Sequence, residues 1–369
     1  MSKSPASTAE VPKQLLDYHI RHQIDLGRYG NQVVQDVIGL LNEAEKEIIA
    51  KLIKRGTDER WTAEWLRSLL VELGQINYDA HVEAGKQLVK EMYGFADHEA
   101  KTTAELLQTQ VPIMFSVLQP AAAQLSAIVD KEPITVGPDK KLLLEEIFQS
   151  LAKGKEERIR GAVRLGIVQG ETIDQMVRRL RGTRAARYTD GILEVDRRGA
   201  AAMVRTICTH VSNQAVQKTY LENAEILSGW IFLATLDSKV SITCASLSGT
   251  EHPLGKGPIP PLHVNCRSSA LGKPKTLREL GIDVDEVPLT TRASKDGPVR
   301  ADISFDEWLQ GQPVTVQRNI LGATRQQLFA DGKMPMSRFT NDKGVVYSLT
   351  QLEHRNREMF DQVFGPGYR

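Results

Sequence analysis

Gly229-Trp-Ile-Phe-Leu-Ala-Thr235 is an apolar, aromatic run that begins at a glycine. A short run of this kind predicts a buried β-strand. The preceding residues, Ile192–Glu222, contain few helix breakers after Gly199 and predict one long helix. The following residues, Gly249–Pro261, hold three glycines and four prolines and predict a structured loop or hairpin. A helix, a buried strand and a loop in this order indicate a small α+β domain.

The sequence on the N-terminal side of this domain is predicted to be helical. Apolar residues at helical spacing indicate helices over Asn31–Arg55, Thr62–Tyr93 and Lys140–Ala152. We therefore expect a mainly helical α+β protein with three regions. These are a helical N-terminal region over residues 1–152, the α+β domain with short strands and a Cys/His loop over residues 153–272, and an irregular C-terminal tail over residues 273–369.

The tail contains two helix-start signals. Ser304-Phe-Asp-Glu307 and Thr350-Gln-Leu-Glu353 both have the pattern of a capping box, so a short helix is predicted to begin at each. Glu286–Arg300 is polar and holds two prolines and one glycine, which predicts a linker.

The overall composition conceals a charge asymmetry. The 369 residues include 47 Lys and Arg against 46 Asp and Glu, in proportions typical of a folded chain, and three cysteines are too few for a disulfide scaffold. However, residues 1–150 hold 16 basic and 22 acidic side chains, whereas residues 151–205 hold 13 basic and 7 acidic ones. One short segment thus carries a net charge of +6 after a first region of −6, and this asymmetry indicates a charged partner.

The densest part of that segment is Arg178-Arg-Leu-Arg-Gly-Thr-Arg-Ala-Ala-Arg187, which contains no acidic residue. Guanidinium groups bind phosphate well, so the pattern predicts contact with the backbone of double-stranded DNA. The alternatives are a solvated face, an acidic protein partner, and the acidic helical region of the same chain. The residues assigned to phosphate binding are Arg178, Arg179, Arg181, Arg184 and Arg187.

Two of the three cysteines and two histidines fall close together after the predicted strand. Cys244, His263 and Cys266 offer the thiolate and imidazole ligands that Zn²⁺ prefers, and His252 or Asp237 could supply a fourth ligand. Three alternatives stay open: a buried thiol pair with a hydrogen-bonded histidine, a disulfide between the two cysteines, and a cysteine nucleophile with a histidine base. The third cysteine, Cys208, lies on the predicted long helix and is expected in the core.

Leu106–Val129 contains no charged residue and is long enough to span a bilayer. Four glutamines and two prolines within it favour a buried, proline-interrupted helical segment, so we expect no stable membrane span. The chain also lacks the phosphate-binding loop, the dinucleotide-binding glycine pattern, the zinc-protease motif and the serine-hydrolase elbow. These absences count against ATP-driven packaging and the common hydrolase mechanisms.

Four quoted stretches carry a resemblance to a known family. They are Arg205-Thr-Ile-Cys-Thr-His-Val-Ser-Asn-Gln-Ala215, Gly229-Trp-Ile-Phe-Leu-Ala-Thr-Leu-Asp-Ser238, Cys244-Ala-Ser-Leu-Ser-Gly249 and Pro260-Pro-Leu-His-Val-Asn-Cys-Arg267. In order and spacing they resemble the phage head morphogenesis domain of the Mu F-like minor capsid proteins. By this resemblance Asp237 and Arg267 are signature positions together with Cys244, His263 and Cys266. Family members often end the motif with Cys-Arg-Cys, where this chain has Cys266-Arg267-Ser268, so one candidate zinc ligand is missing.

The resemblance implies a minor capsid protein of a tailed bacteriophage. Such a protein is made in the host cytoplasm and lies inside the head near the portal. Its implied partners are the portal protein, capsid or scaffolding proteins, and double-stranded DNA, and its implied roles are head assembly and DNA packaging or ejection. No enzymatic activity is expected. The alternatives are a metal- or thiol-dependent enzyme that acts on nucleic acid or protein, and an internal protein ejected with the genome.

Overall fold

A computed structural model describes residues 13–56, 62–111, 114–281, 291–294, 297–300, 303–341 and 344–367. Its longer helices are α1 (Lys13–Gly56), α2 (Ala63–Gln108), α3 (Ala122–Lys131), α4 (Leu144–Val168), α5 (Ile173–Arg181) and α6 (Ile192–Glu222). The later helices are α7 (Ile242–Leu247), α8 (Phe305–Gln310), α9 (Val314–Leu321), α10 (Ala323–Ala330), the 3-10 helix η2 (Met336–Phe339), α11 (Leu349–Arg355) and α12 (Arg357–Phe364). The strands are β1 (Ile134–Gly137), β2 (Lys140–Leu142), β3 (Leu227–Leu233), β4 (Glu251–His252), β5 (Ser269–Pro274), β6 (Thr291–Ser294) and β7 (Gly297–Arg300). The fold is therefore mainly helical α+β, as the sequence predicts.

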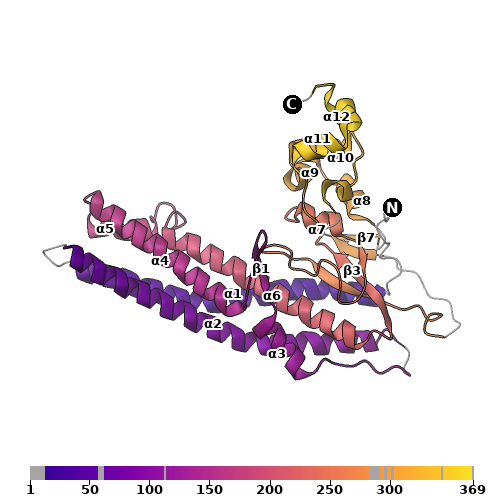
Figure 1. Ribbon diagram of the computed structural model, residues 1–369, viewed down its shortest axis with the longest axis horizontal. Helices are drawn as coiled ribbons and strands as arrows, with labels where there is room; N and C mark the ends of the chain where they lie inside the picture. Colours follow the sequence, from indigo (N-terminus) through magenta and orange to yellow (C-terminus); the bar gives the residue numbers. More distant parts are fainter. Residues whose placement is uncertain are drawn as a thin grey trace.

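Four long helices, α1, α2, α4 and α6, lie side by side and form an elongated bundle (Figure 1). One apolar core, which we call the proximal core, joins them near the sheet and includes Leu41, Leu88, Phe148 and Ile207. A second apolar core, the distal core, lies at the far end, where α5 packs on the bundle. Its buried members are Ile48, Leu52, Leu69, Leu70, Leu73, Ile159, Ala162, Val163, Met176, Leu180 and Leu193.

A buried polar layer separates the two cores. On every helix of the bundle, polar side chains occupy the turns between the two apolar sets. They are Glu45 on α1, Asn77 and His81 on α2, Lys155 on α4, and Asp196 on α6. The Lys155 Nζ donates to Glu45 Oε1 at 2.8 Å, and the Asn77 amide donates to the Ala152 carbonyl oxygen at 2.7 Å. These bonds satisfy groups whose burial is otherwise costly, and they connect three of the helices.

The C-terminal half of α6 supports a three-stranded antiparallel sheet with the order β4-β3-β5. Two α6 side chains bond to β5: the Ala270 N–H donates to Asn213 Oδ1 at 3.0 Å, and the Gly272 N–H donates to the Tyr220 hydroxyl at 2.8 Å. Trp230 on β3 is fully buried, and its indole N–H donates to the carbonyl oxygens of Pro253 and Lys256. The proline-rich loop after β4 is thereby fixed to the central strand.

The C-terminal helices α8 to α12 stand together beside the sheet and have their own apolar core (Figure 1). Phe305, Trp308 and Phe339 are buried in that core, together with Leu236 and Ala245 from the sheet region. A further link joins the two parts, because the Thr340 hydroxyl donates to the Ser246 hydroxyl of α7 at 2.9 Å. The tail is thus packed against the α+β region.

Several predicted elements are confirmed, and others need correction. The helix over Ile192–Glu222 and the helix start at Ser304 are confirmed. The predicted strand lies two residues earlier, at Leu227–Leu233. The capping box predicted at Thr350 is wrong, because Ser348 caps α11 and accepts from the Gln351 N–H.

Most of the other helix predictions are too short. α1 already begins at Lys13, well before Asn31, and α2 continues beyond Tyr93 to Gln108. The predicted helix over Lys140–Ala152 begins later, at Leu144, but continues to Val168, as α4. The linker predicted over Glu286–Arg300 lies partly outside the described residues, and its described part is the β6–β7 hairpin.

The uncharged segment Leu106–Val129 differs from the buried helical segment that we expect. Between α2 and α3 its described backbone is irregular, and Met114 and Leu118 are 76% and 55% exposed. Polar side chains hold it: the Gln108 amide bonds to the backbone of Phe115 and Val117, and Asn223 bonds to both backbone groups of Leu118. Among the described residues, no helix is long and apolar enough to cross a membrane.

The three-region division of the chain stays a prediction. Residue 152 lies within α4 and residue 272 lies within β5, so both predicted boundaries fall inside continuous elements. The proximal core also combines residues from both sides of the first boundary, such as Phe148 and Ile207.

Candidate metal centre and arginine loop

The candidate metal centre begins at the N-terminus of α7, which follows β3 after a short loop. Ser241 caps this helix, because its hydroxyl accepts a hydrogen bond from the Cys244 N–H at 3.1 Å. The cap fixes the first turn of α7, and Cys244 lies in that turn with its side chain almost fully buried.

The other two candidate ligands come from the turn that precedes β5. The Cys266 N–H donates to the His263 carbonyl oxygen at 3.1 Å, which closes the turn. Asn265 lies between them in a left-handed conformation with φ of 59°, a position that Asn tolerates better than most residues. Its N–H donates to the Thr206 hydroxyl of α6 at 2.9 Å. The long helix thereby positions the turn opposite α7.

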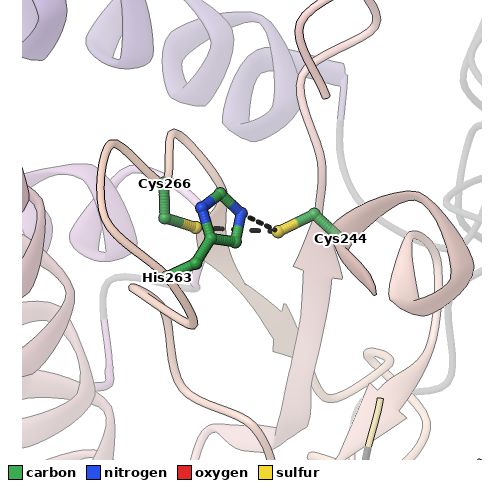
Figure 2. A group of neighbouring side chains, drawn as sticks. All are labelled: Cys244, His263 and Cys266. Carbon is green, nitrogen blue, oxygen red and sulfur yellow. Dashed lines mark hydrogen bonds between the residues drawn. The ribbon is translucent and has the colours of Figure 1, made fainter. Parts of the chain in front are cut away.

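Cys244, His263 and Cys266 meet between these two elements (Figure 2). The Cys244 Sγ lies 3.3 Å from His263 Nε2 and 3.7 Å from Cys266 Sγ. The three candidate ligand atoms all lie within 4.8 Å of one another. The sequence places these residues 22 positions apart at most, and the fold brings them into direct contact.

Hydrogen bonds orient the His263 ring toward the thiols. The Nδ1–H donates to the Val264 carbonyl oxygen at 2.9 Å, so in the neutral ring Nε2 carries the free lone pair. The Ser241 hydroxyl lies 2.9 Å from the same Nε2. A backbone acceptor on one ring nitrogen is the usual arrangement for a metal-binding histidine, because it fixes the tautomer and the ring plane.

The two thiols share a proton unequally. The hydrogen bond with Cys244 lowers the pKa of Cys266, although burial opposes this shift, and the same bond together with burial raises the pKa of Cys244. The hydrogen bond with Cys266 raises the pKa of His263 despite the opposing effect of burial. A thiolate at Cys266 is thus the favoured charged species, and thiolates are the form in which cysteine binds metal.

The geometry fits a divalent metal ion such as Zn²⁺. Two thiolates about 2.3 Å from one tetrahedral ion lie roughly 3.8 Å apart. The observed separation of 3.7 Å between the sulfur atoms matches that requirement. The group supplies three ligands, whereas structural zinc sites in proteins are usually closed by four.

Neither predicted fourth ligand belongs to the cluster. His252 is held elsewhere: its Nε2 lies 2.8 Å from the Thr250 hydroxyl, and its ring packs on Trp230 with 4.7 Å between the ring centres. Asp237 instead pairs with Arg267 through two hydrogen bonds. Burial raises the pKa of Asp237, but the bonds from Arg267 outweigh it, so the net pKa is lowered. The two signature residues therefore link the end of β3 to the turn that carries Cys266.

Cys208 lies apart from the centre, in the proximal core. It is 1% exposed, and burial raises the pKa of its thiol to about 12. This environment matches the expectation of a core thiol.

The predicted phosphate-binding arginines lie at the distal end of the bundle, on α5 and the loop that joins it to α6 (Figure 1). Four of the five are exposed: Arg178, Arg181, Arg184 and Arg187. Arg179 differs, because its guanidinium bonds to the Glu171 carboxylate and to the Gln169 side chain. The structure thus separates one internally paired arginine from four exposed ones.

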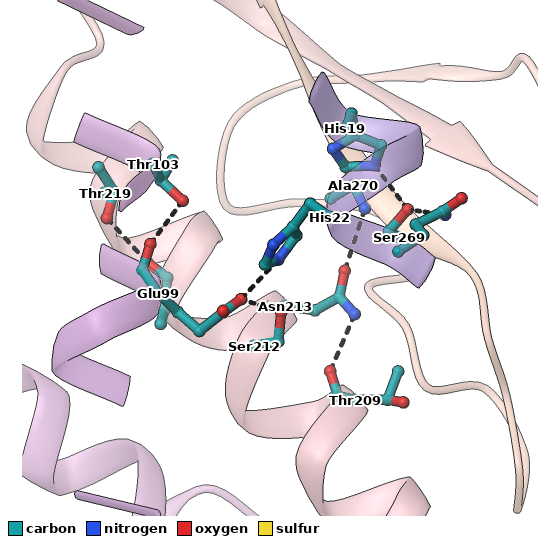
Figure 3. Close-up of polar contacts among 12 residues, drawn as sticks. His19, His22, Glu99, Thr103, Thr209, Ser212, Asn213, Thr219, Ser269 and Ala270 are labelled. Carbon is teal, nitrogen blue, oxygen red and sulfur yellow. Dashed lines mark hydrogen bonds and ion pairs between the residues drawn. The ribbon is translucent and has the colours of Figure 1, made fainter. Parts of the chain in front are cut away.

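A second polar group escapes prediction from sequence. His22 Nε2 lies 2.8 Å from the buried Glu99 carboxylate, which also accepts from the Ser212 hydroxyl, and His19 Nε2 lies 2.6 Å from the Ser269 hydroxyl (Figure 3). These partners come from α1, α2, α6 and β5. The sequence offers no signal for them, because they are 77 to 250 residues apart in the chain.

Comparison with known proteins gives one result. The model of the family described as phage Mu protein F like protein matches residues 157–271, which is less than half of the chain. No curated protein and no solved structure matches. The matched range contains the loop between α5 and α6, residues 182–191, which we call the arginine loop. It also contains the β3–β5 pair up to Leu271 and the whole Cys/His cluster. The resemblance carried by the quoted motifs is confirmed: residues 157–271 are a phage Mu protein F like domain, the domain of a phage head morphogenesis family.

Proposed function

We propose that this phage head morphogenesis protein is a minor capsid protein that lies inside the head near the portal. Its partners are the portal protein, capsid or scaffolding proteins, and packaged double-stranded DNA. The observation that carries the proposal is the match of residues 157–271 to the phage Mu protein F like family. The elongated bundle supports it further, because a rod with a basic tip can reach from a protein surface to the genome (Figure 1).

The basis for DNA contact is the set of exposed arginines at the distal end. Among the described residues no carboxylate pairs with Arg178, Arg181, Arg184 or Arg187, so their guanidinium groups are available to phosphates. Contacts of this kind are independent of base sequence, which suits a protein that meets a whole packaged genome.

Location is tested by fractionation of purified virions. We expect the protein in DNA-filled heads, and its absence from purified heads would contradict the proposal. Cross-linking within the head should recover the portal protein among its neighbours.

DNA contact is tested with a charge-removal variant in which the four exposed arginines become glutamine. We expect weaker binding to a random-sequence DNA duplex, and the log–log salt slope should fall by about 1 for each phosphate that is no longer bound. The control removes the same charge from exposed lysines elsewhere: Lys86, Lys90, Lys101 and Lys239. An equal loss of DNA affinity in the two variants would indicate only a general effect of charge. It would contradict the assignment of DNA contact to the four exposed arginines.

We also propose that Cys244, His263 and Cys266 bind Zn²⁺. A bound ion would cross-link α7 to the turn before β5 and so lock the small sheet region. Stoichiometric zinc in the purified protein is expected, with loss of that zinc in Cys244→Ser. Cys208→Ser is the matched control, because this buried thiol lies outside the cluster and should leave the metal content unchanged.

We propose that the role is structural and not catalytic. The second candidate is a metal- or thiol-dependent enzyme acting on nucleic acid or protein. It is favoured by one observation, namely that the cluster supplies three ligands, as catalytic zinc sites do. DNA cleavage or proteolysis by the zinc-loaded protein, lost in Cys244→Ser but kept in Cys208→Ser, would establish that candidate and overturn the structural role.

A further inference from the structure

The loop between α5 and α6, residues 182–191, is closed by one carboxylate. Asp190 Oδ1 accepts from the Thr183 N–H at 2.8 Å, and Asp190 Oδ2 accepts from the Thr183 hydroxyl at 2.8 Å. These bonds lower the pKa of Asp190 and keep it charged. The Tyr188 N–H also donates to the Thr183 carbonyl oxygen at 2.8 Å. The two hydrogen bonds from Thr183 to Asp190, which we call the latch, thus close the base of this exposed loop.

The base of the loop leaves no room for a side chain at Gly191. A Cβ on Gly191 would lie 2.3 Å from the carbonyl carbon of Arg181, so the two ends of the loop meet backbone to backbone. Gly182 has φ of 93°, a conformation that favours glycine. The glycines at both ends therefore permit a closed loop of fixed shape.

Two consecutive residues of the loop have unfavourable backbone conformations. Arg187 and Tyr188 have φ values of 51° and 62°, in the left-handed region that L-residues other than Asn and Asp seldom adopt. Such conformations persist only where surrounding contacts enforce them, and they concentrate at functional sites. Here the hydrogen bonds at the base of the loop supply that constraint, and the side chains of Arg187 and Tyr188 are exposed.

The closed loop displays a group of arginines. Arg184 and Arg187 project from the loop itself, and the Arg181 guanidinium lies over the Tyr188 ring, 4.8 Å from its centre. The ring restricts the motion of Arg181 without neutralising its charge. Three exposed arginines thus lie on or directly before one closed loop at the distal end of the bundle.

We propose that Asp190 is a positioning residue that holds this loop in the shape in which Arg181, Arg184 and Arg187 contact the phosphates of double-stranded DNA. The inference rests on the DNA contact proposed above. A loop ordered in advance loses less conformational entropy on binding than a flexible one. An acidic residue beside a phosphate-binding surface should otherwise weaken binding by repulsion, so its presence there is explained by the two bonds to Thr183.

The proposal and simple charge repulsion predict opposite effects of one mutation on DNA affinity. Simple repulsion predicts that Asp190→Ala strengthens DNA binding, whereas loss of the latch predicts weaker binding by about fivefold, the factor for one ordinary hydrogen bond. Asp190→Asn removes the charge but keeps an oxygen that can accept from the Thr183 N–H, so we expect affinity at or above that of the parent. Thr183→Val keeps the charge and removes the hydroxyl, and it should weaken binding like Asp190→Ala.

The measurement is fluorescence anisotropy of the full chain with a short random-sequence DNA duplex at several salt concentrations. Asp174→Ala is the matched control, because Asp174 is an exposed acidic residue on α5 outside the latch, and its removal should not weaken binding. Circular dichroism checks that each variant keeps its helix content. Binding by Asp190→Ala that equals or exceeds that of Asp174→Ala overturns the latch.

The outcomes separate this inference from the proposed function. If the four-arginine variant loses affinity and Asp190→Ala does not, DNA contact stands and the latch fails. If the four-arginine variant binds DNA like the parent, the DNA-binding face itself fails. Competition by polyglutamate as effective as competition by unlabelled duplex would assign the loop to an acidic protein surface and overturn the DNA assignment.

Discussion

At the scale of single residues, the pair Asp237 and Arg267 connects the two halves of the Cys/His cluster. Arg267 follows Cys266 directly, and Asp237 lies in the loop between β3 and α7. The pair makes two hydrogen bonds, and the Asp237 carboxylate also accepts from the Lys239 N–H at 2.8 Å. The two side chains are 23% and 42% exposed, so solvent screens much of their attraction. Their main effect is geometric, since a bidentate pair fixes direction as well as distance.

We predict that Asp237→Asn lowers the free energy of unfolding by about 1 kcal/mol at neutral pH, the upper range for a partly exposed pair. The pKa of Asp237 lies below its ordinary value of 3.8, so its contribution is present above that pH and is lost as the pH falls through the lower folded pKa. The difference between variant and parent should therefore vanish in strong acid. Denaturant unfolding of both proteins at neutral pH and near pH 3 measures it. An equal difference at both pH values would contradict this assignment.

At the scale of elements, the first turns of α1 are joined to three other elements by the polar group of Figure 3. His19 bonds to Ser269 on β5, and His22 bonds to Glu99 on α2, which in turn accepts from Ser212 on α6. Burial and, to a smaller extent, the nearby His22 together lower the pKa of His19 to about 3. Burial also opposes the charge of His22, but its hydrogen bond with Glu99 raises the pKa overall. The two histidines therefore respond to acid in opposite directions.

We predict that His19→Gln reduces the loss of stability between pH 7 and pH 5. The folded pKa of His19 lies below 6.5, so the unfolded chain takes up the proton first and stability falls as the pH drops through the window from 6.5 to about 3. At pH 5 this loss amounts to about 2 kcal/mol in the parent. The contribution of His22 has the opposite sign and remains in the variant. Denaturant unfolding at both pH values checks the prediction.

The exposed His98 provides the control for that experiment. His98→Gln makes the same substitution at a surface site, so the comparison separates the effect of burying His19 from that of losing a histidine. If the parent protein loses no more stability than His19→Gln between pH 7 and pH 5, His19 is not the source of the acid-induced loss.

Local signals predict elements well where neighbouring residues decide the structure. The helix starts at Thr62 and Ser304 and the bounds of α6 follow from residues within one or two turns. Composition suggests the pairing of Cys244 with the His263–Cys266 turn, but the exclusion of His252 depends on its packing against Trp230. Similarly, the sequence does not distinguish Arg179 from the four other predicted phosphate-binding arginines. Its ion pair with Glu171, which does, is visible only in the structure.

Tertiary contacts explain what local signals miss. α2 extends to Gln108 because its second half, with Leu88, Phe95 and Leu107, packs against other elements of the fold. The start of α1 lies far before its regular apolar stripe because His19 and His22 bond to distant partners. Helices stabilised mainly by tertiary packing can exceed the range that their own periodicity indicates.

At the scale of the whole molecule, the polar layer separates the end that carries the arginine loop from the end that carries the Cys/His cluster. The distal core holds α5 in place, whereas the proximal core supports α6 where it meets the sheet. Lys155 and Glu45 are almost fully buried at the junction, and Glu45 also lies 3.8 Å from Arg197. A buried ion pair adds little net stability but is costly to break on one side only. The layer is therefore the position at which the two halves can lose their coupling.

We predict that Lys155→Met destabilises the protein by about 3 kcal/mol, because it leaves the Glu45 carboxylate buried without its main partner. The double variant Lys155→Met with Glu45→Leu should recover most of that loss, since no unpaired buried carboxylate remains. Lys86→Met, at an exposed site on α2, is the neutral control. A single variant as stable as the parent would contradict the assigned role of the pair.

The same variants test whether the two halves open separately. In Lys155→Met, native-state hydrogen exchange should quicken first in the distal half, at the amides of α5 and of α4 beyond residue 155, while β3 and β5 keep their protection. The reason is that the distal core is the smaller one and, in the part of the chain that the structure describes, is connected to the sheet through the bundle. The proximal core is in addition braced by α3 and by the bonds from α6 to β5. Uniform loss of protection along all four helices would instead mean that the bundle opens as one cooperative unit. In that case the arginine loop could not change its position without disturbing the Cys/His cluster at the other end.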